Sequence, residues 1–147
     1  MDVGEVLDPA GAGMMLVAAA ETDRRRDPAG ALAGYGHAMD WFEKAGMPLD
    51  AVHAMIGYAH ALAALGRHGE AECWARRALL HNRLPGGFVA DPRCEIDILL
   101  VLASSAKLPL GDLAGARACL ERAVTLADAQ GTAHLAARAR ALLAGIR

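Results

Sequence analysis

The sequence predicts an all-α fold, in which three antiparallel helix hairpins stack as an α-solenoid and a C-terminal capping helix covers the last hairpin. Apolar residues make up 54% of the chain and aromatic residues only 4%. The apolar content is therefore mostly alanine and leucine, which suit closely packed helices. The alternating apolar and polar runs that are typical of strands are missing from the sequence. Glycine and proline divide the chain into segments of helix length.

Caps and breakers predict the helices of the first two hairpins in order. Asp27 followed by Pro28 is an N-cap with a favourable first helical residue behind it. Asp50 is expected to cap the third helix, and Gly46 and Gly66 are expected to end the second and third. These signals predict helices at about 10–25, 28–46, 50–66 and 69–82.

The third hairpin follows a longer loop that covers residues 83–93. Asp91 and Pro92 repeat the cap-and-proline signal, and the fifth helix is expected to end near Lys107, ahead of Pro109. Asp112 should cap the sixth helix and Thr132 the seventh, with Gly131 between them. We therefore expect one domain over residues 1–147, with repeat units at about 10–46, 49–82 and 92–130 and a capping helix at 132–146. The capping helix should cover the last unit with Leu135, Leu142, Leu143 and Ile146.

A triplet of mostly small residues recurs in the second helix of each expected hairpin. Its spacing of i, i+4, i+7 puts the three side chains on one helix face. Alanine at such positions lets a neighbouring helix approach closely. The triplets, which are expected to form the packing between repeats, are Ala31, Tyr35 and Ala38, then Ala71, Ala75 and Ala78, then Ala116, Leu120 and Ala123.

The stretch LGRHGEAECWARRALLHN, residues 65–82, resembles the second half of a tetratricopeptide repeat (TPR). That motif has Leu-Gly at the turn between helices, then a small residue, an aromatic residue four positions on, and alanine three after that. The triplets start at positions 31, 71 and 116, hence 40 and 45 residues apart, rather than at the usual spacing of about 34. The chain thus resembles a degenerate TPR-like protein, similar to the helical repeats of large bacterial transcription regulators.

This resemblance implies a protein-interaction adaptor or regulatory module that binds a partner segment in a concave groove. The first helix of each unit would line the groove, and the third helix is its expected centre. The groove residues that the resemblance implies are His53, Ile56, Gly57, His60, Ala63 and Ala64. Two alternatives stay open. One is a small-molecule-binding or enzymatic protein that uses the same groove, with Ser104 and Ser105 as further polar groups, and the other is a structural homodimer.

The sequence points to no catalytic residues, metal site or cofactor. His53 and His60 share a helix face but lie about 10 Å apart, too far for one metal ion without another ligand. His37 is the only further histidine expected to approach them, and no HxxxH or HExxH pattern occurs. The three cysteines lack CxxC spacing, which favours a reduced, cytoplasmic protein over a disulfide framework or zinc ribbon.

Charge and hydropathy predict that neither nucleic acid nor a membrane is a partner. The formal net charge is −2, without the basic excess that nucleic-acid binding usually needs. The only basic run, Arg24 to Arg26, is best interpreted as a helix C-terminus. The apolar stretch near the N-terminus follows no basic segment and is too short to span a bilayer. Both tryptophans, Trp41 and Trp74, are expected in the core, with an interface anchor as the alternative for Trp74.

Overall fold

A computed structural model describes residues 8–83, 85–86 and 89–146 of the chain. Within these residues the regular elements are seven α-helices and one π-helical segment, and the only β-type pairing is an isolated bridge between Arg83 and Val89. The prediction of an all-α protein is confirmed. In chain order the elements are α2 (Pro9–Asp23), α3 (Pro28–Lys44), α4 (Pro48–Ala64), α5 (His68–His81), α6 (Pro92–Val101), η1 (Leu102–Lys107), α7 (Leu113–Gln130) and α8 (Ala133–Ala144).

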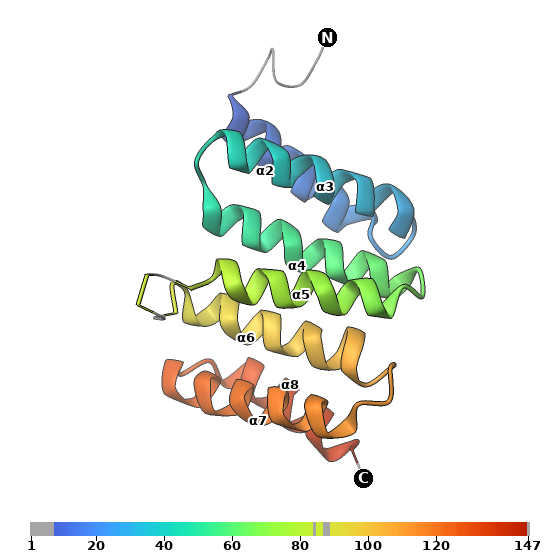
Figure 1. The fold of residues 1–147 in the computed structure, drawn as a ribbon, viewed down its shortest axis with the longest axis vertical. Helices are drawn as coiled ribbons and strands as arrows, with labels where there is room; N and C mark the ends of the chain where they lie inside the picture. Colours follow the sequence, from blue (N-terminus) through green and yellow to red (C-terminus); the bar gives the residue numbers. More distant parts are fainter. Residues whose placement is uncertain (1–7, 84, 87–88, 147) are drawn as a thin grey trace.

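Successive helices pack against one another along the long axis of the molecule (Figure 1). The strongest contacts join α2 to α3, α3 to α4, α4 to α5, and α7 to α8. The helices α2 and α3 lie at one end of the stack, and α7 and α8 at the other. Further contacts of α4 and α5 with α6 join the two ends into one continuous arrangement.

The short connections between helices use a recurring glycine turn, which α4 illustrates. Gly66 follows the helix with a φ of 78°, a left-handed conformation that side chains with a Cβ atom disfavour. The N–H of Arg67 then donates to the carbonyl of Leu62 at 2.9 Å, and that of Gly66 to Ala63 at 3.0 Å. These two bonds form a Schellman cap, so the next helix starts only two residues after the glycine.

The nine triplet residues are all buried, with at most 2% of their surface exposed. Those on α5 belong to a core cluster that also contains Phe42, Val52 and Leu62. Those on α7 belong to a second cluster, where Leu135 of α8 is buried and Leu142, Leu143 and Ile146 pack at its edge. The helix α8 thus covers apolar surface of α7.

The fifth expected helix changes its winding part-way. It is α-helical to Val101 and π-helical from Leu102 to Lys107, and the N–H of Leu108 donates to the carbonyl of Ala103 five residues earlier, at 2.9 Å. The sequence predicts an ordinary α-helix here, and no pattern in it predicts the π-helical winding. A π-helical turn accommodates one extra residue and rotates the side chains that follow it.

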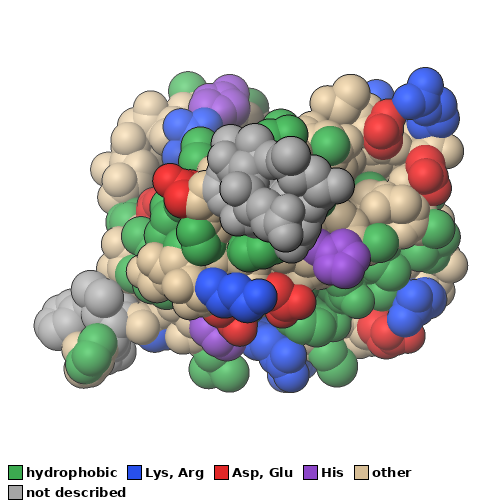
Figure 2. Space-filling model, turned by 90° about the horizontal axis from the view of Figure 1, so that it is seen from above, with side chains coloured by type: hydrophobic (Ala, Val, Ile, Leu, Met, Phe, Trp, Pro, Cys, Tyr) green, Lys and Arg blue, Asp and Glu red, His purple; other side chains and the backbone are tan. Residues whose placement is uncertain are grey.

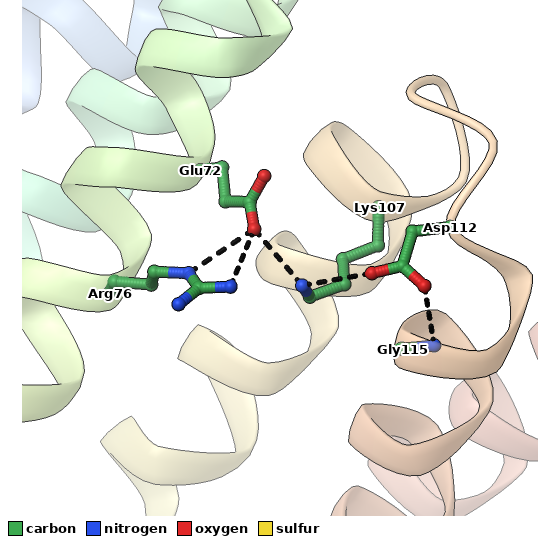
Figure 3. Close-up of polar contacts among 5 residues, drawn as sticks. All are labelled: Glu72, Arg76, Lys107, Asp112 and Gly115. Carbon is green, nitrogen blue, oxygen red and sulfur yellow. Dashed lines mark hydrogen bonds and ion pairs between the residues drawn. The ribbon is translucent and has the colours of Figure 1, made fainter.

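That rotation directs Lys107 into a polar cluster between α5 and the start of α7 (Figure 3). Its ammonium group lies 3.0 Å from Glu72 and 3.1 Å from Asp112, and these hydrogen bonds raise the pKa of Lys107. Asp112 caps α7 by accepting from the N–H of Gly115 at 2.9 Å, and Arg76 donates to Glu72 at 2.8 Å. One nearly buried lysine therefore connects three elements.

Several local expectations need correction. Asp50 lies in the first turn of α4 and Met47 occupies the cap position, because the helix already begins at Pro48. The Thr132 hydroxyl does not cap α8 but donates to the carbonyl of Ala127 at 3.2 Å. Trp41 is only half-buried, with the Lys44 ammonium 4.7 Å from its ring centre, and the neighbouring Phe42 fills the core instead. No helix in the described part of the chain is long and apolar enough to cross a membrane.

Candidate functional site

A small cavity of about 150 Å³ lies among α2, α4, α6 and α8. The helix α4 supplies its central wall, α2 and α6 lie on either side, and Arg138 reaches it from α8. Four of the expected groove residues line it together. The complete lining is Glu21, Arg24, His53, Ile56, Gly57, His60, Asp97, Leu100, Val101 and Arg138.

At Gly57, one of the lining residues, the ring of Tyr35 lies directly against the backbone. A Cβ atom at position 57 would overlap the aromatic ring. The Tyr35 hydroxyl is buried and has no hydrogen-bond partner among the described residues. Burial raises the pKa of this hydroxyl, while Arg24 and Glu21 act on it with opposite signs. The ring carbon that carries this hydroxyl lies against Gly57, which is itself a lining residue.

The electrostatic environment of the cavity is clearest at His60. Burial first, and then the positive charges of Arg24 and Arg138, lower the pKa of His60 to about 4. The imidazole is therefore neutral at pH 7. Neither arginine forms an ion pair with an acid within the described residues, whose ion pairs involve other cations. The charged groups that shift the pKa of His60 are thus both positive.

Two acidic residues, Glu21 and Asp97, line the same cavity. Burial raises the pKa of the Asp97 carboxyl, which Arg93, His53 and Arg138 partly offset. Glu21 is exposed at the rim of the cavity. The lining is therefore mixed in charge, with two arginines, two acids and a neutral imidazole beside the apolar residues Ile56, Leu100 and Val101.

The remaining expected groove residues lie elsewhere. Ala63 packs against the first core cluster, and Ala64 is exposed at the end of α4, so neither lines the cavity. Ser104 donates to the carbonyl of Leu100 at 2.8 Å, and the Ser105 carbonyl lies 2.8 Å from Nδ1 of His68. Both serines are in the π-helical segment and do not reach the cavity, because the changed winding directs them toward other partners.

His53 has a neighbour that the sequence analysis did not consider. Its Nε2 lies 3.3 Å from Sγ of Cys94, and that thiol donates to Oδ2 of Asp91 at 3.4 Å. Burial first, and then nearby carboxylates led by Asp91, raise the pKa of the Cys94 thiol to about 12. A catalytic cysteine needs a lowered pKa and an accessible sulfur, whereas Cys94 is 1% exposed. The pair is therefore not an activated nucleophile.

A buried polar network holds the start of α6 in place and was also not predicted. The Asn82 amide donates to the carbonyl of Asp91 at 2.9 Å and accepts from its N–H at 3.2 Å. Asn82 also donates to Glu95 at 3.3 Å, and Arg83 donates to Glu95 at 2.6 Å. Asn82 and Glu95 are fully buried. Ile98 and Leu99, three and four residues after Glu95, are the sequence signal that Glu95 lies on the apolar face of α6.

A second, wider depression of about 460 Å³ lies between α3 and the aromatic rings of Tyr58 and Trp74. These ring centres are 4.8 Å apart, and the Arg77 guanidinium lies 4.5 Å from the Trp74 ring. His37 lines this depression rather than the cavity that contains His53 and His60. Trp74 is half-buried against the first core cluster. It is therefore neither fully in the core nor fully exposed, the two alternatives that the sequence left open.

Surface charge is mixed at the end of the molecule that carries α2 and α3. Figure 2 shows Lys and Arg side chains interspersed with Asp and Glu side chains on this face, among many hydrophobic ones. Arg26 and Asp23, both exposed, also form an ion pair, so here too a basic side chain lies beside an acidic one. The side chains drawn on this face therefore do not form a concentrated basic surface.

A comparison of the chain with models of known protein families, with curated proteins and with solved structures finds no match. The function is therefore inferred from the geometry of this chain alone. Fold and function are separable in helical proteins, so the properties of the cavity carry more weight than the helical architecture.

Proposed function

We propose that this protein is a TPR-like α-solenoid that binds a segment of a partner protein, and that an acidic group of that segment enters the cavity at His60. The observation that carries this proposal is that Arg24 and Arg138 line one cavity with His60, without acidic ion-pair partners within the described residues. A carboxylate there would accept charge-assisted hydrogen bonds from the guanidinium groups. The Tyr35 hydroxyl, whose ring packs on Gly57 of the cavity lining, is a further donor without a partner among the described residues.

The solenoid itself is supported by three features. The buried triplets recur on α3, α5 and α7, Schellman-type glycine turns recur between helices, and each helix packs mainly on its neighbours in the chain. Proteins built in this way present preformed concave surfaces. A preformed surface lowers the entropic cost of binding a flexible segment.

The size of the cavity favours a partner segment over a free small molecule. Ligand pockets usually measure roughly 300–1,000 Å³, whereas this cavity measures about 150 Å³. That volume suits one side chain or a terminal carboxylate, with the rest of the ligand outside. Binding affinity must then come from a larger contact along the helices, as it does when a protein segment binds.

The test is a screen of immobilised peptides with free C-terminal carboxylates, matched to the same peptides with amidated ends and with internal Asp or Glu. Selected peptides are measured by calorimetry against the parent protein, Arg24→Gln and Arg138→Gln. Loss of a hydrogen bond to a charged group typically costs about 1.5–3 kcal/mol, so each variant should bind roughly tenfold to a hundredfold more weakly.

Arg25→Gln is the matched control, because Arg25 is exposed beside Arg24 but does not line the cavity. It should bind selected peptides like the parent. Equal affinity for all three arginine variants would move the binding surface away from the cavity, with the depression at Trp74 as the next candidate. Light scattering of the free protein tests the homodimer alternative, since a dimer would double the mass without any peptide.

A further inference from the structure

Three side chains from two separate helices bring different ligand atoms together at one edge of the cavity. His53 on α4, together with Asp91 and Cys94 at the start of α6, places Nε2, a carboxylate oxygen and Sγ within 4.8 Å of one another. Sγ lies 3.3 Å from Nε2 and 3.4 Å from Oδ2 of Asp91. Sγ is thus in contact with both of the other ligand atoms.

These distances are close to those around a tetrahedral zinc ion. With Zn–S near 2.3 Å and Zn–N or Zn–O near 2.0–2.2 Å, neighbouring ligand atoms lie roughly 3.5 Å apart. Both measured distances from Sγ fall near this value. All three ligand atoms lie within 4.8 Å of one another, and His53 is exposed, so that its ring has room to turn toward an ion.

The carboxylate of Asp91 is able to serve as a ligand without loss of the helix cap. Oδ1 accepts from the N–H groups of Arg93 and Cys94, at 3.0 and 3.4 Å, while Oδ2 faces the thiol. The backbone of Asp91 is fixed on both sides by the buried Asn82 amide. Two of the three ligands therefore occupy fixed positions, which reduces the ordering that metal binding requires.

Two further acidic residues lie one helical turn from the cluster. Asp50 precedes His53 by one helical turn and lines a cavity with it, and Asp97 follows Cys94 by one turn and lines the other cavity with His53. A thiolate and one carboxylate balance the charge of a divalent ion. Thiolate and imidazole select transition metals over Ca²⁺ or Mg²⁺, which prefer oxygen ligands.

We infer that His53, Asp91 and Cys94 form a binding site for a divalent transition metal of the Zn²⁺ class, with a fourth position open to solvent. Sγ gives up its proton on binding and donates its electron pair to the metal, as Nε2 and Oδ2 do. The ion joins α4 to the start of α6 and so connects two neighbouring helix pairs. Three protein ligands and one open position are typical of zinc sites that exchange a water or a ligand.

The experiment uses the tag-free full chain, reduced and freed of metal, with Zn²⁺ measured by calorimetry and Co²⁺ by absorption. We expect one equivalent of Zn²⁺ to bind and to raise the melting temperature, and Co²⁺ to give a thiolate-to-cobalt charge-transfer band. His53→Gln should weaken Zn²⁺ binding at least about tenfold, and Cys94→Ser should abolish the charge-transfer band.

Asp91→Asn is the most informative variant, because asparagine still caps the helix but is a weaker metal ligand. It should keep the helix content and lose metal affinity. His134→Gln and Cys73→Ser, both exposed and outside the cluster, should bind like the parent. The inference is overturned if metal binding is undetectable, if it is unchanged in His53→Gln and Asp91→Asn, or if Cys73→Ser removes it.

Discussion

The lowered pKa of His60 predicts that this one residue makes the protein less stable in mild acid. The unfolded chain takes up a proton at this histidine near pH 6.5, whereas the folded protein does so only near pH 4. Between these values the unfolded state binds more protons, so the free energy of unfolding falls as the pH falls. The full effect below pH 4 is at most about 3 kcal/mol, of which up to about 2 kcal/mol is lost between pH 7 and pH 5.

His60→Gln removes the titrating group and keeps a polar side chain of similar length. Urea unfolding of both proteins at pH 7, 6 and 5 gives the free energy of unfolding at each pH. The parent should lose up to about 2 kcal/mol more than the variant between pH 7 and 5, which corresponds to roughly 1 M in the urea midpoint. Taking the difference between the two proteins cancels the titration of other groups.

His134→Gln controls for the removal of a histidine as such, because His134 is exposed on α8. Its stability should follow the parent at every pH. If His60→Gln and the parent lose the same stability between pH 7 and 5, then His60 is not held neutral by burial and the two arginines. The binding of an acidic group proposed for the cavity would then lose support.

Three further predictions concern packing. Gly57→Ala should cost about 1–3 kcal/mol of stability, because the new methyl group overlaps the Tyr35 ring. Gly69→Ala, where a Cβ meets no atom within 4 Å, should instead stabilise the protein by about 0.5–1 kcal/mol. Melting temperatures that shift in the same direction in both variants would contradict this. Ala71→Leu should overpack a site that is 1% exposed and cost about 1–3 kcal/mol; an unchanged urea midpoint would show that α5 faces the core differently. Deletion of residues 132–147 should expose the apolar face of α7 and cause aggregation or loss of cooperative unfolding; an unchanged melting curve of a soluble truncated chain would make α8 an appendage.

Local patterns in the sequence were sufficient for the helices and for much of their packing. The caps at Asp27, Asp91 and Asp112 act within three residues, and a left-handed glycine ends a helix wherever it lies, so both can be read from a short segment. The triplet spacing is likewise a property of one helix. That is why the nine triplet residues could be named, and why His53 and His60 could be assigned to one face of α4.

The tertiary structure decided what those faces meet. The contact of His53 with Cys94 joins residues 41 positions apart, and the cavity joins α2 to α8; both depend on how several helices stack. The π-helical winding that directs Lys107 toward Glu72 and turns Ser104 away from the cavity has no local signal of its own. Periodicity determines which side of a helix is apolar, whereas the partners of polar side chains depend on distances between helices, which only the packed chain defines.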